Sequence, residues 1–140
     1  MAAVAQFLAD TSAIARYPRG EVAARLDPLV IAGQVATCAL VDLQLLYSTR
    51  GQAEYVKLAA IRRACFPLLA TEDADLRRAA QLQAALATRS RHRIAWPDLV
   101  IAAVAERHGV TLLHYDADYD LIADITGQRI EWVVPKGSLP

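Results

Sequence analysis

The chain has 140 residues, of which 55% are hydrophobic and 21% are charged, and its formal net charge at pH 7 is zero. This length and composition are typical of a single globular domain, here residues 1–140, and exclude a disordered chain. All but two of its fifteen cations are arginines, which suit planar, bidentate contact with phosphate or carboxylate.

No apolar stretch is long enough to span a bilayer, and the opening residues MAAVAQFLAD carry no basic leader. We therefore expect a soluble, cytoplasmic protein without a membrane partner. Cys38 and Cys65 lie far apart and show no C-x-x-C spacing, which argues against both a disulfide framework and a zinc site. Both cysteines are expected to be small buried residues.

The first half of the chain alternates short apolar runs with helical periodicity. AQFLA (5–9) is predicted to be a buried strand that ends at Asp10. Helices are predicted over 11–18 and 21–33, with Asp27 and Pro28 as a cap and first-turn pair and Gly33 as the stop. A second strand is expected at 35–40, followed by helices over 41–48 and 52–64.

The second half continues this alternation. A short strand is predicted at 67–70, followed by a helix whose N-cap is Thr71 and whose first turn holds Glu72, Asp73 and Asp75. Its apolar stripe is formed by Leu76, Ala79, Ala80, Leu82 and Leu86. Pro97 opens the next helix and Gly109 closes it. The last two strands are predicted at 110–115 and 131–135.

Strands that alternate with helices predict an α/β fold with a mostly parallel sheet and helices on both faces. In such a sheet the carboxyl ends of the strands and the amino ends of the following helices lie along one edge. Asp10 and Asp116 each follow a predicted strand, and Asp98 lies in the first turn of a predicted helix. The three carboxylates are therefore expected to face one crevice.

Each acid also has a simpler interpretation when taken alone. Asp10 and Asp98 could serve helix amino ends, and Asp116 and Asp118 could form turns. Together, however, carboxylates that converge on one sheet edge repel one another unless a cation is present. Because their oxygens are hard ligands, the combination favours a site for Mg²⁺ or Mn²⁺.

A basic segment, TRSRHR (88–93), precedes the helix that carries Asp98. It contains Arg89, Arg91 and Arg93, and such a segment is more often a solvated loop than a binding surface. Contact with RNA is the alternative interpretation, and it gains weight only if another feature indicates nucleic acid.

Four stretches, in this order and spacing, carry a resemblance to a known family: FLADTSAIA, LVDLQLLYS, WPDLVIAAVAERHGVTLLHYDADYD and DLIADITGQRIEWVVPKGSL. They resemble the PIN-domain ribonucleases, and among these the VapC toxins of bacterial toxin-antitoxin pairs, nearly from end to end. The resemblance implies a three-layer α/β/α fold with a central, mostly parallel sheet.

The family's metal-binding acids correspond to Asp10 in the D-T/S-S motif, Asp98 in the P-D motif, and Asp116 in the D-x-D-F-like motif. Asp118 matches that motif's second and less regular acid, and Tyr119 stands where phenylalanine is usual. Thr11 and Ser12 would supply hydroxyls or backbone amides beside the same site.

Gln44 departs from the family pattern, because the helix after the second strand normally reads E-L-x-Y-G. Glutamine keeps the length of glutamate and one acceptor oxygen but loses the charge, so it should bind a hard dication less tightly. Asp42 is a poor substitute, since two helical residues subtend about 200° and its side chain should point to the opposite side. Whether Gln44 is natural or was introduced to silence a toxic enzyme is left open by the sequence.

The resemblance implies hydrolysis of an RNA phosphodiester, in a tRNA or rRNA, with Mg²⁺ or Mn²⁺ as cofactor. It also implies neutralisation by a VapB-type antitoxin, commonly through an arginine inserted among the carboxylates, and a homodimer. A receiver domain fits less well, because it needs a lysine at a late strand end and Lys136 lies too close to the C-terminus. A haloacid-dehalogenase-type phosphatase fits less well, because it needs D-x-D after the first strand, where this chain has Asp10-Thr11-Ser12. The main alternative is a catalytically silent form of the fold that binds RNA or antitoxin without cleavage.

Overall fold

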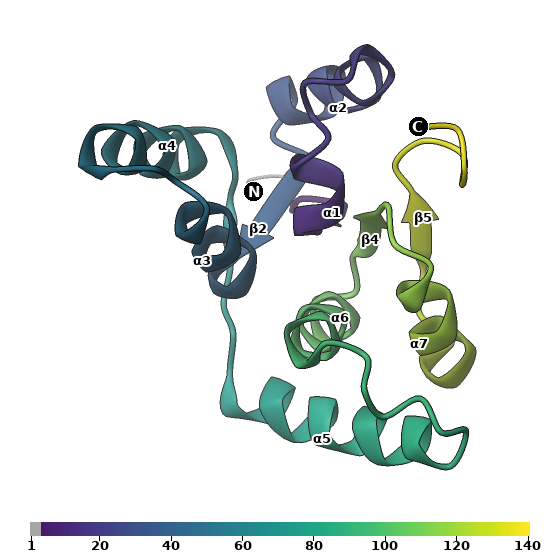
Figure 1. The fold of residues 1–140 in the computed structure, drawn as a ribbon. Helices are drawn as coiled ribbons and strands as arrows, with labels where there is room; N and C mark the ends of the chain where they lie inside the picture. Colours follow the sequence, from purple (N-terminus) through teal and green to yellow (C-terminus); the bar gives the residue numbers. More distant parts are fainter. Residues whose placement is uncertain (1–3) are drawn as a thin grey trace.

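The computed structural model describes residues 4–140. These residues form a five-stranded sheet and seven helices (Figure 1). The elements in chain order are β1 (Phe7–Ala9), α1 (Thr11–Ile14), α2 (Gly20–Ile31), β2 (Val35–Cys38), α3 (Ala39–Tyr47), α4 (Gln52–Cys65), β3 (Leu68–Leu69), α5 (Asp73–Ala87), α6 (Trp96–His108), β4 (Thr111–His114), α7 (Asp118–Thr126) and β5 (Ile130–Trp132).

The sheet has the order β3-β2-β1-β4-β5, and every pair of neighbouring strands is parallel. The chain therefore starts at the centre, with β1 between β2 and β4, and builds outward to both edges. Phe7 of β1 is in register with Val35 on one side and Thr111 on the other. The predicted α/β class and mostly parallel sheet are confirmed.

Two apolar clusters fill the spaces above and below the sheet, so that the molecule has three layers. Alternate residues of each strand face opposite sides. Leu8, Cys38 and Leu112 pack with residues of α5, α6 and α7, whereas Ala9, Val35 and Leu113 pack with residues of α1 and α2. Figure 1 shows these two groups of helices on opposite sides of the strands. Helix α6 is almost wholly buried from Leu99 to Ala105.

Most element boundaries lie close to those predicted, and the differences have local causes. Helix α2 runs through Asp27 and Pro28, and the Asp27 carboxylate accepts a hydrogen bond from the Tyr17 hydroxyl and does not cap a helix. Gly33, with φ of 71°, ends that segment as expected. The helix predicted over 11–18 is only the four-residue α1.

The start of α5 lies one residue later than predicted. Glu72, not Thr71, is the N-cap, because Glu72 and Asp75 form a reciprocal capping box. In the predicted apolar stripe, Ala79, Leu82 and Leu86 are buried, but Leu76 and Ala80 face solvent. Cys65, the last residue of α4, is exposed, so the prediction that both cysteines are buried holds for Cys38 alone.

Helix α7 is absent from the predicted elements, although it carries one of the predicted site residues, Asp118. It forms because its apolar residues recur at helical spacing: Tyr119 and Ile122 are fully buried against α6 and the sheet, and Leu121 and Ile125 pack beside them. None of the helices between residues 4 and 140 is both long and apolar enough to cross a membrane.

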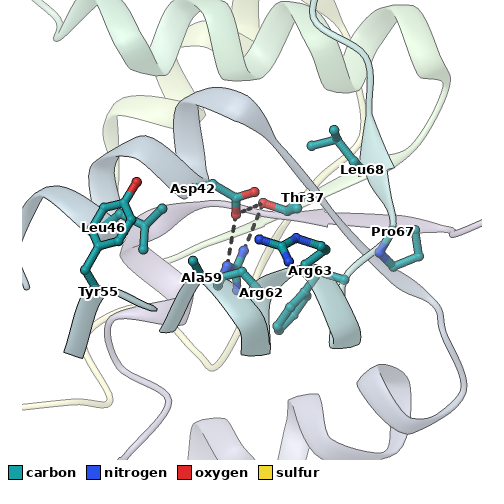
Figure 2. A pocket seen from close by; sticks show the side chains of 10 residues that line it. Thr37, Asp42, Leu46, Tyr55, Ala59, Arg62, Arg63, Pro67 and Leu68 are labelled. Carbon is teal, nitrogen blue, oxygen red and sulfur yellow. Dashed lines mark hydrogen bonds and ion pairs between the residues drawn. The ribbon is translucent and has the colours of Figure 1, made fainter. Parts of the chain in front are cut away.

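Helices α3 and α4 are fastened to β2 by a buried polar cluster of Thr37, Asp42 and Arg62 (Figure 2). Arg62, which is 3% exposed, donates from Nε to Asp42 Oδ1 at 3.0 Å and from Nη2 to Thr37 Oγ1 at 2.9 Å. The Thr37 hydroxyl donates to Asp42 Oδ1 at 2.9 Å. A cavity of about 450 Å³ opens beside the cluster, with Tyr55 and Pro67 among its walls.

This cluster should be worth more than any exposed ion pair of the molecule. Asp42→Asn leaves the buried Arg62 guanidinium without its counter-ion, and we expect the free energy of unfolding to fall by about 3 kcal/mol. Asp73→Asn is the matched control, because it breaks an exposed pair with Arg77 and should cost less than about 1 kcal/mol. Urea unfolding at pH 7 measures both, and equal losses would contradict a structural role for the cluster.

Candidate metal centre

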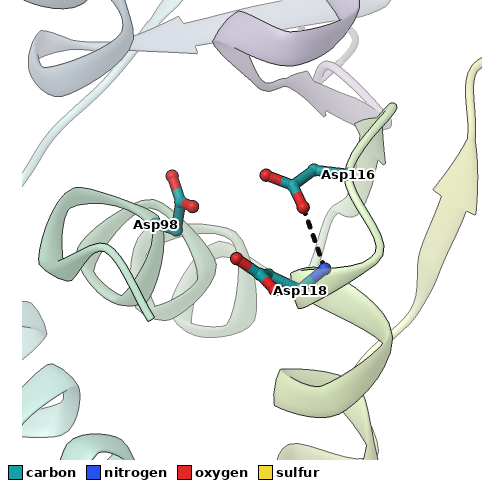
Figure 3. A group of neighbouring side chains, drawn as sticks. All are labelled: Asp98, Asp116 and Asp118. Carbon is teal, nitrogen blue, oxygen red and sulfur yellow. Dashed lines mark hydrogen bonds between the residues drawn. The ribbon is translucent and has the colours of Figure 1, made fainter. Parts of the chain in front are cut away.

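Three carboxylates meet at the edge of the sheet where β4 ends (Figure 3). Asp98 lies in the first turn of α6, Asp116 follows β4, and Asp118 is the first residue of α7. One oxygen from each of them lies within 4.8 Å of the others. The structure therefore brings together three acids that the sequence analysis assigns to a metal site.

Local hydrogen bonds determine where these acids point. The Asp116 carboxylate accepts a hydrogen bond from the backbone N–H of Asp118 at 2.9 Å, which fixes the turn between β4 and α7. Pro97 begins α6 at its preferred first-turn position, so that Asp98 is presented from the helix amino end. The simpler interpretations of these acids, as turn and helix-end residues, thus hold at the same time as their convergence.

Asp10 lies beside this trio and is 3% exposed. Its Oδ2 accepts from the backbone N–H of Ser12 at 2.9 Å and caps α1, while its Oδ1 accepts from the Tyr119 hydroxyl at 2.7 Å. Asp10 is not one of the three residues whose oxygens meet within 4.8 Å, but its negative charge raises the pKa of Asp98. It is therefore an electrostatic neighbour of the trio.

The carboxylates of the cluster repel one another, and this repulsion raises the pKa values of two of them. Burial, followed by the charges of Asp10, Asp116 and Asp118, raises the pKa of Asp98 to about 7. Burial and Asp116 also raise the pKa of Asp118, while Arg91 lowers it. A divalent cation would remove this repulsion, and carboxylate oxygens are the donors that Mg²⁺ and Mn²⁺ prefer. The residues present fit such an ion.

Thr11, Ser12 and Gln44 surround the acids on the side of α1 and α3. The Thr11 hydroxyl donates to Gln44 Oε1, which joins the amino end of α1 to the middle of α3. The Ser12 hydroxyl accepts from the backbone N–H of Tyr115 at 2.9 Å. Gln44 therefore lies next to the residue that follows Asp10, whereas Asp42 on the same helix is engaged with Arg62 on the other side. The side chain of Asp42 thus points away from that of Gln44, as the helical spacing predicts.

Tyr119 is a site residue that the sequence identifies only as a departure from the usual phenylalanine. It is fully buried, and burial together with the charges of Asp10 and Asp98 raises its pKa well above the ordinary value. The phenol therefore stays protonated and donates to Asp10. His114 lies behind it with ring centroids 5.1 Å apart, and burial lowers the pKa of the imidazole. In the sequence, only its position next to Asp118 in the motif indicates that Tyr119 belongs to the site.

The basic segment 88–93 is a loop between α5 and α6, as its composition predicts. Arg89, Arg91 and Arg93 are exposed, and none of the ion pairs found among residues 4–140 involves them. Arg91 is nevertheless close enough to the acids to lower the pKa of Asp118. The loop therefore borders the candidate metal centre.

Comparison with known proteins gives a consistent result. The model of the PIN domain family matches residues 7–125. The chain is 42% identical to ribonuclease VapC51 of Mycobacterium tuberculosis over 96% of this chain and 97% of the relative. It is 40% identical to ribonuclease VapC21 of the same organism, over 95% of this chain and 97% of that one.

Solved structures share the fold at lower identity. VapBC2 from Rickettsia felis, bound to a DNA fragment from its promoter, aligns with a TM-score of 0.73 at 15% identity, over 92% of this chain and 98% of that chain. Mycobacterium tuberculosis VapC20, described as a sarcin-ricin loop cleaving toxin, aligns with a TM-score of 0.57 at 23% identity, over 82% and 93% of the two chains. These likenesses support the three-layer arrangement.

The raised pKa of Asp98 predicts a pH-dependent stability. The pKa of this carboxyl is near 3.8 in the unfolded chain and about 7 in the folded protein. Below about pH 4 the raised pKa therefore does not reduce the free energy of unfolding, and the reduction reaches its full size above pH 7. Without divalent ions, Asp98→Asn should therefore raise the free energy of unfolding at pH 8, on the order of 2 kcal/mol, and change it little at pH 4.

With Mg²⁺ at pH 8 the stability advantage of Asp98→Asn over the wild type should shrink or reverse. The wild-type protein gains melting temperature by binding the ion in the folded state, whereas Asp98→Asn gains less. Thermal melts at both pH values, with Mg²⁺ and with chelator, measure all four conditions. A stabilisation by Asp98→Asn that is the same at pH 4 and pH 8 would show that Asp98 is not held in a field of negative charge.

Proposed function

Since the chain belongs to the PIN domain family and is closely related to VapC ribonucleases, we propose that it is an endoribonuclease toxin that uses Mg²⁺ or Mn²⁺ to cleave RNA of the tRNA or rRNA class. One observation carries this proposal: the oxygens of Asp98, Asp116 and Asp118 converge within 4.8 Å, with Asp10 beside them. The relatives are named ribonucleases, and a carboxylate cluster that binds a dication is one of the arrangements that can hydrolyse a phosphodiester.

The roles of the residues follow from their positions. Asp98, Asp116 and Asp118 would hold the ion directly, and Asp10 would add negative charge from the buried side. A bound dication supplies neutralisation of the phosphate charge and a lower pKa for a coordinated water. Tyr119 and Ser12 keep Asp10 in place by donating to its two oxygens, and Thr11 orients the side chain at position 44. No nucleophilic side chain is then needed.

Gln44 weakens the site in this proposal. Its amide lies within hydrogen-bonding reach of Thr11, where a glutamate would add a negative charge to the metal field. The amide preserves the hydrogen bond and the packing of the side chain, while the attraction for a dication is reduced. We therefore propose a folded protein with low ribonuclease activity.

An antitoxin of the VapB type is the proposed protein partner. Related structures are VapBC complexes, and the acid cluster would accept a positively charged side chain from such a partner. A cavity of about 590 Å³ between α1, α2 and α4 offers a neighbouring apolar surface, with Tyr17, Leu58 and Ile61 among its walls. A homodimer is also proposed, supported by Leu43 and Tyr47, which lie one turn apart on α3 and are 65% and 91% exposed.

The alternative function is a silent form of the same fold that binds RNA or the antitoxin without cutting. Gln44 favours this alternative, because the lack of a negative charge at this position weakens metal binding but does not weaken binding of RNA or antitoxin. Cleavage assays distinguish the two functions.

We expect Gln44→Glu to confer or greatly increase metal-dependent RNA cleavage. The two purified proteins are compared on total tRNA and ribosomal RNA with Mg²⁺, with Mn²⁺ and with chelator. In chelator, the added carboxylate should leave the variant no more stable than the protein with Gln44, because it adds repulsion. Equal, chelator-sensitive cleavage by both proteins would show that position 44 is not the weakened ligand, and no cleavage by either would favour the silent form.

The basic segment is proposed to lie on the RNA path. Replacing Arg89, Arg91 and Arg93 together by alanine should weaken RNA binding, and each lost phosphate contact should flatten the log-log dependence of affinity on salt by roughly one unit. Fluorescence anisotropy over a range of salt concentrations measures the slope. An unchanged affinity and slope would identify the segment as a solvated loop.

A further inference from the structure

A small cavity of about 230 Å³ lies between the arginine loop and the start of α7. Two of its walls are basic, from Arg91 and Arg93, and Asp118 forms part of another. Asp118 is also a member of the acid cluster, so the cavity and the candidate metal centre share one residue. Arg89, on the same loop, does not line it. We propose that this cavity is a phosphate subsite, which binds the RNA phosphate next to the one that is cleaved.

The loop that carries the two arginines is held at its first turn. The backbone N–H of Arg91 donates to the carbonyl of Leu86 at 2.9 Å, and that of Ser90 to the carbonyl of Ala87 at 3.0 Å. These two bonds form the Schellman arrangement that ends many helices, and they require a left-handed residue, here Ser90 with φ of 56°. Ile94, which is buried, anchors the other end. Arg91 therefore leaves α5 in a fixed direction, toward α7.

The charges of the cavity suit an anion once the acid cluster is neutralised. The residues that line the cavity include two arginines and one aspartate, and the guanidinium group of arginine binds phosphate in a planar, bidentate manner. Asp118 opposes an anion as long as its charge is free. When a dication binds the acid cluster, that opposition falls, so binding of the dication and binding of phosphate should each strengthen the other.

The choice of phosphate, rather than an acidic side chain of a protein, follows from the position of the cavity. It adjoins the cluster that we propose to act on a phosphodiester, and a single strand bound there has further phosphates on both sides of the cleaved one. This inference rests on the proposed function for the identity of its ligand. The existence of an anion site at Arg91 and Arg93 is independent of it.

Sulfate is a suitable probe for the subsite itself, because it is a tetrahedral dianion that does not precipitate Mg²⁺. Its binding to the full chain is followed by NMR titration with Mg²⁺ present and chloride as the ionic-strength control. Arg91→Ala should weaken sulfate binding about tenfold, the loss expected for a hydrogen bond to a charged group. Arg50→Ala is the control, because it removes an exposed arginine that does not line the cavity, and it should bind sulfate as the wild type does. Equal binding by Arg91→Ala and wild type would overturn the subsite.

The coupling to the acid cluster has a separate readout. In wild type, sulfate should bind more weakly when Mg²⁺ is replaced by chelator. In Asp118→Asn it should bind in chelator at least as tightly as wild type does with Mg²⁺, because the opposing charge is gone. Sulfate affinity that is indifferent to both Mg²⁺ and Asp118 would contradict a subsite placed against the cluster.

RNA binding then tests the identity of the ligand. For a single-stranded oligoribonucleotide, Arg91→Ala should reduce the salt slope by roughly one unit and Arg89→Ala by less. An RNA affinity that ignores Arg91, in a protein whose sulfate binding depends on it, would overturn the assignment to RNA phosphate. Intact sulfate binding combined with no cleavage by Gln44→Glu would instead count against the proposed function.

Discussion

Mutual repulsion among carboxylates is the constraint on which the rest of this structure depends. Asp98, Asp116 and Asp118 are drawn together at one edge of a parallel sheet (Figure 3), with Asp10 beside them, and none of the ion pairs found among residues 4–140 involves these four acids. The fold must hold these groups in place by other means. Tyr119 and Ser12 donate hydrogen bonds to Asp10, and the backbone of Asp118 donates one to Asp116. These donors stabilise the carboxylates in place of a counter-ion. The same hydrogen bonds therefore hold the acids in place and keep them positioned to bind a cation.

Helix α3 divides its polar residues between two tasks. Asp42 faces β2 and α4 and satisfies a buried guanidinium, whereas Gln44 reaches the opposite way to Thr11 beside the acids. The angle of about 200° between residues two apart on a helix makes this division unavoidable. A charge lost at position 44 is for this reason not recovered from position 42, even though the two residues are neighbours in sequence.

The sequence was sufficient to predict the features that depend on chain order. Parallel strands bring their carboxyl ends to one edge whatever their side chains do, so the meeting of Asp98 with Asp116 follows from alternation alone. Features that depend on side-chain packing were harder to predict from the sequence. Thr71 is the more usual kind of N-cap residue, and the box between Glu72 and Asp75 becomes evident only from the side-chain hydrogen bonds. The helical spacing of Tyr119 and Ile122 is visible in the sequence, but their burial against α6 is not. The closeness of the arginine loop to Asp118 is likewise a tertiary property.

The two outer strands of the sheet are unusually short, and this limits how the protein can associate. β3 has two residues and follows Pro67, while β5 has three and ends three residues before Pro135. A strand edge recruits other chains through its unpaired N–H and C=O groups, and short edges flanked by proline offer few of them. A chain that is 55% hydrophobic can therefore expose both ends of a parallel sheet without providing a template for cross-β aggregation. We therefore expect this protein to associate through its helical surfaces.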